Sequence, residues 1–122
     1  MQFAMLIYEP GDAFESRKSG KGGAYTAAWR SYHKALAESG AFVAGDPLAA
    51  PETGTTIRIR ERKRVVQDGP YADSKEQLGG FTIVEAASLD AVLEWAARCP
   101  AASYGAVEVR PLAPELKQRI VE

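Results

Sequence analysis

The chain has 122 residues and a mass of 13.2 kDa, which suits one domain, residues 1–122, with a single hydrophobic core. Its net charge of −1 and pI of about 5.9 give no overall field that favours nucleic acid or an anionic membrane. The single cysteine, Cys99, excludes an internal disulfide and a Cys-x-x-Cys metal site. No apolar run approaches the roughly 20 residues that span a bilayer, and the N-terminus does not resemble a signal peptide. We therefore expect a cytoplasmic protein.

The first third of the chain alternates between strand and helix patterns. Residues 2–8 are apolar on both faces, which predicts a central strand that is covered on both sides. Residues 11–23 are polar and rich in glycine and lysine, which predicts a mobile loop. In residues 24–39 the apolar side chains recur with helical period, and Gly40 is a suitable left-handed stop. A short strand is expected at residues 41–45.

The rest of the chain begins with a predicted hairpin. Residues 55–60 alternate polar and apolar side chains, which predicts a strand with one polar face. Residues 63–67 are its expected partner, although Glu61 and Arg62 form a poor turn by composition. After residues 68–80 the later elements are expected in this order: a strand at 81–86, a helix at 89–98 capped by Ser88, a strand at 104–112 and a helical tail at 114–122.

This order of elements predicts an α+β fold, the ferredoxin-like plait with an added β-hairpin. In that fold both helices cover one face of the sheet. The first strand is apolar on both faces, so the second face also needs a cover. A second copy of the chain is the expected cover, which predicts a homodimer.

Residues 68–81, DGPYADSKEQLGGF, carry more sequence information than a plain connection needs. Gly69 and Pro70 favour a tight turn, because proline fixes its own φ and glycine permits conformations that other residues resist. Gly79 and Gly80 allow the next strand to lie with its backbone close to a neighbour.

The chain resembles the YCII-related family, and in particular its DGPF branch. The resemblance is carried by residues 68–81, by the apolar N-terminal strand that ends in Tyr8, and by four further segments: SGAFVAG at 39–45, TTIR at 55–58, EWAA at 94–97 and VEVRP at 107–111. It implies a ferredoxin-like dimer whose sheets pack into an α/β barrel, similar in fold to muconolactone isomerase-like proteins. Some members are known or suspected small-molecule enzymes, and DGPF members often accompany extracytoplasmic-function sigma factors. Most members have no established activity.

One departure from the family pattern concerns the first helix. The YCII branch proper carries a histidine about eleven residues before the glycine that corresponds to Gly40, and here that position holds Trp29. His33 lies four residues later and does not match. The histidine-based acid–base chemistry of that branch is therefore not carried over to this chain.

Three residues are candidates for catalysis. Asp68 is a candidate base or hydrogen-bond acceptor with Tyr71 as a donor, although we favour the alternative that Asp68 caps the Gly-Pro turn through its own backbone. His33 is the only side chain of a type that ordinarily titrates near neutrality, and it lies at the border of the apolar stripe. A histidine that merely faces solvent is the favoured alternative there.

Substrate contacts are expected from Tyr8, Trp29, Arg58 and Lys75 in a pocket between the first helix and the sheet. Arg58 is able to hold a carboxylate with two hydrogen bonds. A solvated basic hairpin is the alternative for the cluster around it, and we favour that alternative over a nucleic-acid site. For Lys75 we favour the alternative that a short charged helix ending at Leu78 makes it solvated surface. The basic cluster lacks the aromatic partners of a nucleic-acid site.

No cofactor or metal is predicted. One histidine and one cysteine among scattered carboxylates do not make a closed metal shell. The segment SGKGG at 19–23 lacks the spacing of a phosphate-binding loop. Cys99 is expected to be a buried or inert thiol.

Three hypotheses of function remain, and we favour one of them least: a purely structural subunit, because residues 68–81 carry more information than that role needs. Of the other two, the first is an isomerase, tautomerase or lyase acting on a small anionic organic acid. The alternative is a non-catalytic ligand-binding or regulatory dimer associated with an extracytoplasmic-function sigma factor.

Overall fold

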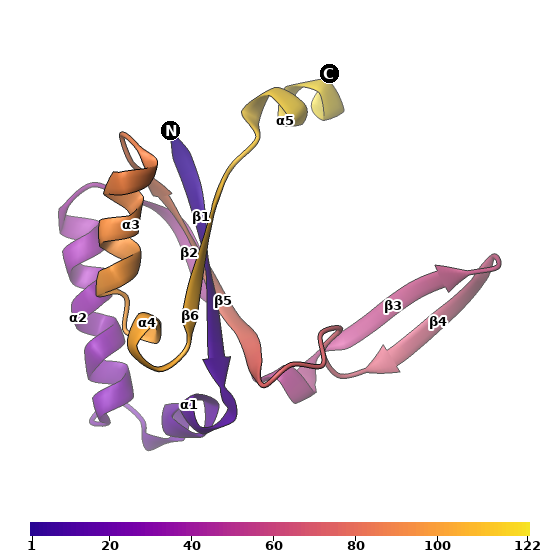
Figure 1. Cartoon of the computed structure of the whole chain (residues 1–122). Coiled ribbons are helices and arrows are strands. Elements are labelled where there is room, and N and C mark those ends of the chain that lie inside the picture. The colour runs from indigo at the N-terminus through magenta and orange to yellow at the C-terminus, as the bar shows by residue number, and fades with distance from the viewer.

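The computed structural model describes all 122 residues, and Figure 1 shows a sheet with helices on one side and a separate hairpin. The main sheet has four strands in the order β2-β5-β1-β6, and every neighbouring pair is antiparallel. Its members are β1 (Gln2–Pro10), β2 (Phe42–Pro47), β5 (Glu76–Glu85) and β6 (Ala106–Pro111). The long helices are α2 (Ala24–Glu38) and α3 (Leu89–Arg98). This arrangement is the ferredoxin-like plait, so the predicted fold class is confirmed.

The core lies between β1 and the two long helices. Alternation along β1 turns Phe3, Met5 and Ile7 towards the helices, where their exposed fractions are 4% or less. They meet Leu36 of α2 and Val92 of α3 in one apolar cluster. Because these side chains recur with period two in the strand and with helical period in the helices, each element buries one apolar stripe.

The other side of the sheet is not covered by either long helix, as Figure 1 shows. We call it the open face; β1 contributes Ala4, Leu6 and Tyr8 to it, all half-buried. β1 lies between β5 and β6, which confirms that it is a central strand. The helix α5 (Pro114–Val121) and the hairpin both leave the domain on the side of the open face (Figure 1).

The hairpin consists of β3 (Thr55–Arg60) and β4 (Lys63–Asp68), which confirms the predicted pair of strands. Its turn residues Glu61 and Arg62 have φ values of 50° and 66°. Positive φ at both positions is typical of a two-residue hairpin turn, but asparagine and glycine usually provide it. The composition of this turn therefore gave little sign of its geometry.

The mobile loop predicted for residues 11–23 was wrong over its first part. The helix α1 (Gly11–Ser16) and the 3₁₀ turn η1 (Arg17–Ser19) follow β1 directly. Ala13 and Phe14 are buried, with exposed fractions of 7% and 8%. The ordering comes from these tertiary contacts, which a polar sequence with no helical period does not reveal.

The charged helix predicted to end at Leu78 is also absent, because β5 already begins at Glu76 and pairs with the end of β1. Two short helical elements were not predicted: η2 (Pro51–Thr53) and α4 (Ala101–Tyr104). The last strand starts at Ala106, after α4, rather than at Tyr104.

Candidate functional site

A cavity of about 700 Å³ lies between α2 and the strands β1, β2 and β5. Ile7 of β1, Leu36 of α2 and Phe42 of β2 contribute apolar surface, and residues 47–49 form part of the lining. This volume and this apolar character are typical of sites for small molecules. A cavity is thus present in the predicted place, between the first long helix and the sheet.

One end of the cavity is formed by Glu9, near the end of β1. The alternation that buries Phe3, Met5 and Ile7 turns Glu9 to the same side, and its exposed fraction is only 1%. A buried carboxylate is strongly unfavourable unless it is paired and hydrogen-bonded. The residues around Glu9 therefore need to supply a positive charge and several donors.

Glu9 receives its hydrogen bonds from three other parts of the chain. Arg17 Nη2 donates to Glu9 Oε1 at 3.0 Å. The Tyr104 hydroxyl donates to Glu9 Oε2 at 2.6 Å, and the Tyr25 hydroxyl lies 2.8 Å from the same oxygen. Trp29 belongs to the same network, because its Nε1 donates to the Tyr104 oxygen at 3.0 Å. We call these five residues the Glu9 cluster.

The hydrogen-bond directions within the Glu9 cluster are fixed. Arg17 Nε donates to the Tyr25 oxygen at 3.2 Å, and Trp29 donates to the Tyr104 oxygen, so both hydroxyl protons point to Glu9. Burial raises the pKa of Tyr25 and of Tyr104, and the hydrogen bond to Glu9 raises both further. Both tyrosines therefore remain donors across the physiological pH range.

Gly79 makes the Glu9–Arg17 pair possible. Its carbonyl accepts a hydrogen bond from Arg17 Nη2 at 3.0 Å. A Cβ atom at this position would lie 2.5 Å from Glu9 Oε1 and 3.1 Å from Arg17 Nη2. Gly79 is also the residue at which the β1–β5 pairing skips a position, from Gly80 to Leu78. Gly79 was predicted to let the strand lie with its backbone close to a neighbour, and here its lack of a side chain leaves room for the Glu9 cluster.

Arg30 and His33 line the cavity from α2, one helical turn apart, and both side chains are exposed. Neither forms a hydrogen bond or an ion pair with another residue. The His33 ring meets Phe42 edge-on, with 4.9 Å between the ring centroids. Since Arg17 already neutralises Glu9, Arg30 is the cavity's available cation. The cavity therefore has apolar walls and, at its exposed side, the unpaired guanidinium of Arg30.

The residues predicted for the site are divided among three places. Trp29 and His33 line the cavity. Tyr8 and Lys75 line a second cavity of about 970 Å³, which also contains Tyr104.

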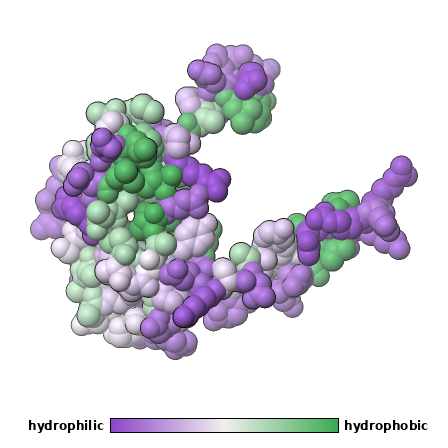
Figure 2. Space-filling model, in the orientation of Figure 1, coloured by the Kyte–Doolittle hydropathy of each residue, from purple (hydrophilic) through white to green (hydrophobic).

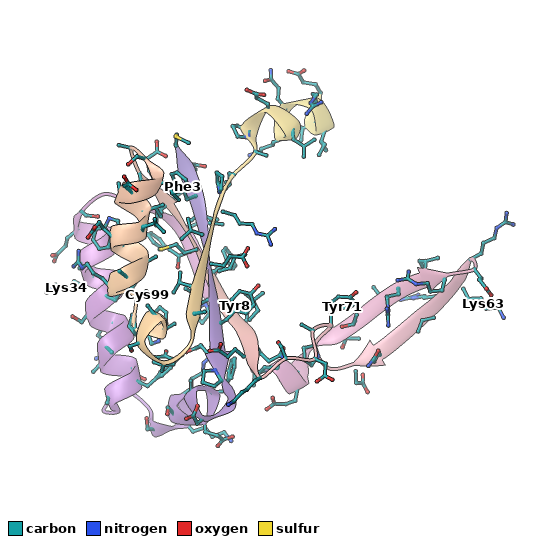
Figure 3. The ribbon with its side chains drawn as sticks, in the orientation of Figure 1. Phe3, Tyr8, Lys34, Lys63, Tyr71 and Cys99 are labelled. Atoms are coloured by element: carbon teal, nitrogen blue, oxygen red, sulfur yellow. The ribbon has the colours of Figure 1, made fainter.

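The remaining three, Arg58, Asp68 and Tyr71, line neither of these two cavities. The Arg58 guanidinium lies over the Tyr71 ring, 5.6 Å from its centroid, and Tyr71 is 73% exposed. Figure 3 shows Tyr71 at the base of the hairpin, at a distance from Tyr8 on the sheet.

Asp68 does not cap the Gly-Pro turn, which corrects the interpretation that we favoured from the sequence. Asp68 is still part of β4, where it pairs with Thr55, and its carboxylate accepts no hydrogen bond. The turn is held instead by the Gly69 N–H, which donates to Gly54 O at 2.7 Å. Thr56 Oγ1 also donates to Gly69 O at 3.0 Å.

Sequence reasoning missed five residues of the site: Glu9, Arg17, Tyr25, Arg30 and Tyr104. The sequence did contain one sign of the site. Glu9 follows Phe3, Met5 and Ile7 at the same two-residue spacing, so a charged side chain occupies a position on the buried face of the strand. Arg17 lies in the segment that was interpreted as a loop, and Tyr25 was counted as part of an apolar stripe.

The fold and the cavity together define a ferredoxin-like α+β domain with room for a small molecule. The family model of the YCII-related domain matches residues 1–115, and the chain therefore belongs to that family. This confirms the resemblance found in the sequence.

One relative is the uncharacterized protein R00369 of Rhizobium meliloti (strain 1021), which is 43% identical over 68 residues. The match covers 54% of this chain and 55% of that protein, so the chain spans about half the length of this relative. A similar solved structure is 5-chloro-2-hydroxyhydroquinone dehydrochlorinase (TftG) from Burkholderia phenoliruptrix AC1100, in complex with 2,5-dihydroxybenzoquinone. It has a TM-score of 0.53 and 21% identity, covering 93% of this chain and 94% of the other. That likeness shows the fold.

The structure contains no group of three or more His, Cys, Asp or Glu side chains placed to hold a metal ion. None of its helices has the length and apolar character needed to cross a membrane. Cys99 is buried, with an exposed fraction of 2%, and burial raises the pKa of its thiol to about 11.

Proposed function

We propose that the cavity binds a small anionic organic acid and that the protein moves a proton on it, as an isomerase, tautomerase or lyase does. The observation that carries this proposal is the pairing of an apolar cavity with the uncompensated Arg30 and the neighbouring His33. An anionic group of the ligand pairs with Arg30, and its carbon skeleton packs against Ile7, Leu36 and Phe42.

His33 is the proton-transfer group in this proposal, because imidazole exchanges protons most readily near neutral pH. Its place beside Phe42, one turn from Arg30, puts it next to an anion held by that arginine. Trp29 forms part of the wall and contacts the ligand. These two residues keep the catalytic and binding roles that the sequence predicted for them.

The Glu9 cluster has a positioning role. Its carboxylate already accepts hydrogen bonds from Arg17, Tyr25 and Tyr104, which leaves it poorly suited to act as a base. It ties β1, η1, α2 and α4 together and so fixes the helix that carries Arg30 and His33.

The solved neighbour supports the choice of ligand. TftG is named as a dehydrochlorinase, and its complex contains 2,5-dihydroxybenzoquinone. That compound is a small planar organic acid whose hydroxyl groups ionise readily, and its size suits a cavity of about 700 Å³. It is therefore a suitable probe for this chain.

We also propose a homodimer in which a second copy covers the open face. The half-buried Ala4, Leu6 and Tyr8 support this, because two sheets of this kind pack by their apolar faces. The roles predicted for Tyr8, Lys75, Arg58, Asp68 and Tyr71 stay predictions, since the proposed chemistry does not use them.

The test is a calorimetric titration with 2,5-dihydroxybenzoquinone and with benzoate. Arg30→Gln should weaken binding by about tenfold, because a charge-assisted contact is lost. The matched control is Lys34→Gln, since Lys34 lies on the outer side of α2 (Figure 3), outside the cavity lining, and should leave binding unchanged. Equal affinity of Arg30→Gln and wild type would refute the site.

Proton transfer is tested separately. NMR follows the replacement of the carbon-bound hydrogens of 2,5-dihydroxybenzoquinone by deuterium when the compound is incubated with the protein in D₂O. Wild type should accelerate the exchange, and His33→Gln should abolish the acceleration while binding persists. Binding by wild type without any accelerated exchange would favour the alternative, a non-catalytic ligand-binding or regulatory dimer.

A further inference from the structure

The hairpin has one apolar and one basic face. The register pairs Ile57 with Val66 and Ile59 with Arg64, so these side chains share one face. Arg58 pairs with Val65, and Arg60 with Lys63, on the opposite face. Ile57, Ile59 and Val66, the apolar hairpin face, have exposed fractions of 54%, 59% and 55%.

Such a hairpin is not stable by its own contacts. An isolated two-stranded hairpin is at best marginally stable in water, and it normally needs a packed apolar face. Here β3 and β4 form a sheet of their own and pair with no strand of the main sheet. Figure 1 shows the hairpin extending away from the helices. The apolar hairpin face therefore needs a cover that its own domain does not supply.

Two other apolar surfaces lie on the same side of the domain. The open face presents Ala4, Leu6 and Tyr8. On α5, Ile120 and Val121 are each 72% exposed. Figure 2 shows hydrophobic surface on the side of α5 that faces the hairpin and on the hairpin itself. The hairpin, α5 and the side of the domain that carries the open face thus lie around one open space, as the space-filling view shows (Figure 2).

The charges favour a second copy of this chain in that space. Residues 55–68, the whole hairpin, contain five Lys or Arg and two acidic residues, a net charge of +3, whereas the rest of the chain contains ten basic and fourteen acidic residues, a net charge of −4. Each copy thus carries a basic arm and an acidic body. A two-fold dimer lets each arm meet the other body, because its interface uses the same surface of both copies.

We propose that the hairpin is an exchanged arm, which packs its apolar face onto a second copy seated against the open face. This inference rests on the homodimer proposed above. It adds that Ile57, Ile59 and Val66 of each copy pack against the other copy. The basic face of the arm remains exposed, and its charge attracts the acidic body of the second copy over a distance rather than through direct contacts.

The test compares substitutions of two neighbouring valines, Val65 and Val66, which lie on opposite faces of the hairpin. Size-exclusion chromatography with light scattering, over a range of protein concentrations, measures the dimer dissociation constant of each variant. Val66→Glu places a charge on the apolar face and should raise the dimer dissociation constant on the order of tenfold or more. Val65→Glu places the same charge opposite Arg58 and should leave the dimer as wild type. A second pair, Ile57→Glu on the apolar face and Gln67→Glu on the opposite face, repeats the comparison with the same change of charge.

The outcomes are distinct. A wild-type dimer of twice 13.2 kDa that is weakened only by Val66→Glu and Ile57→Glu supports the exchanged arm. If all four variants remain dimeric, or all four dissociate alike, the arm proposal is overturned while the homodimer stands. A monomeric wild type overturns both. Circular dichroism and thermal unfolding of each variant verify that the main sheet is still folded.

Discussion

Arg17 Nη2 lies 3.0 Å from Glu9 Oε1 in the lining of the cavity, and the exposed fraction of Glu9 is only 1%. Glu9 belongs to β1 and Arg17 to η1, which follows α1, and the tyrosines that complete the hydrogen bonds of the pair come from α2 and α4. The pair is thus a point at which four elements are held together.

Removing the charge of Glu9 should destabilise the fold strongly. Glu9→Gln keeps the shape but leaves Arg17 without its counter-ion, which should lower the free energy of unfolding by about 2–4 kcal/mol, allowing for the partial exposure of Arg17. Urea unfolding measures the change. The control is Glu15→Gln, which removes an exposed pair with Lys18 and should cost less than about 0.5 kcal/mol. Equal costs for the two variants would contradict a structural role of the buried pair.

Gly79→Ala should displace the same pair. The new methyl group would lie 2.5 Å from Glu9 Oε1, so the carboxylate has to move and weaken its hydrogen bonds. We expect a loss of about 2 kcal/mol, measured by urea unfolding. Gly22→Ala is the control, because no atom lies within 4 Å of a Cβ at that position. In a Glu9→Ala background the cost of Gly79→Ala should shrink, and a constant cost would show that the contact with Glu9 is not its cause.

The sequence predicted those parts of the fold that have a regular period. β1, α2, α3 and the hairpin all show apolar side chains at regular spacing, and their positions agree with the structure within a few residues. The cavity was also predicted in its place between the first long helix and the sheet.

The Glu9 cluster could not be predicted in the same way. Its members come from four elements that contribute one or two residues each, and no period connects them. Arg17 is the clearest example: it follows a helix of six residues, and only the burial of Phe14 and the contacts of Arg17 itself show that the segment is ordered. The conformation of the turn at Glu61 was hidden for a related reason, since its positive φ is imposed by the hairpin rather than by its residue type.

Two neighbouring residues at the base of the hairpin, Gly69 and Asp68, should differ in their contribution to stability. Gly69 has a φ of +98°, so Gly69→Ala should destabilise the hairpin by about 1 kcal/mol or more. The Asp68 carboxylate accepts no hydrogen bond, so Asp68→Asn should leave stability nearly unchanged. Amide hydrogen exchange of residues 55–68 provides the measurement, with faster exchange expected only in Gly69→Ala. Equally faster exchange in both variants would indicate that Asp68 holds the turn after all.

High pH should weaken the fold through Cys99. Burial raises the pKa of its thiol to about 11, whereas an unfolded thiol ionises near 8.5. The folded state therefore keeps a proton that the unfolded state loses. The resulting stability is fully present below about pH 8.5 and is lost as the pH rises towards 11. In urea unfolding under reducing conditions between pH 8 and 10, wild type should lose more stability than Cys99→Ala, and parallel losses would contradict this assignment.

The most direct test of the proposed site is a crystal structure of the wild-type protein soaked with 2,5-dihydroxybenzoquinone. We expect the compound in the cavity between α2 and the sheet, with an ionised oxygen within hydrogen-bond distance of the Arg30 guanidinium and its ring beside Phe42 and His33. A compound bound instead in the cavity of Tyr8 and Lys75, or against Tyr71 at the base of the hairpin, would contradict the proposed site.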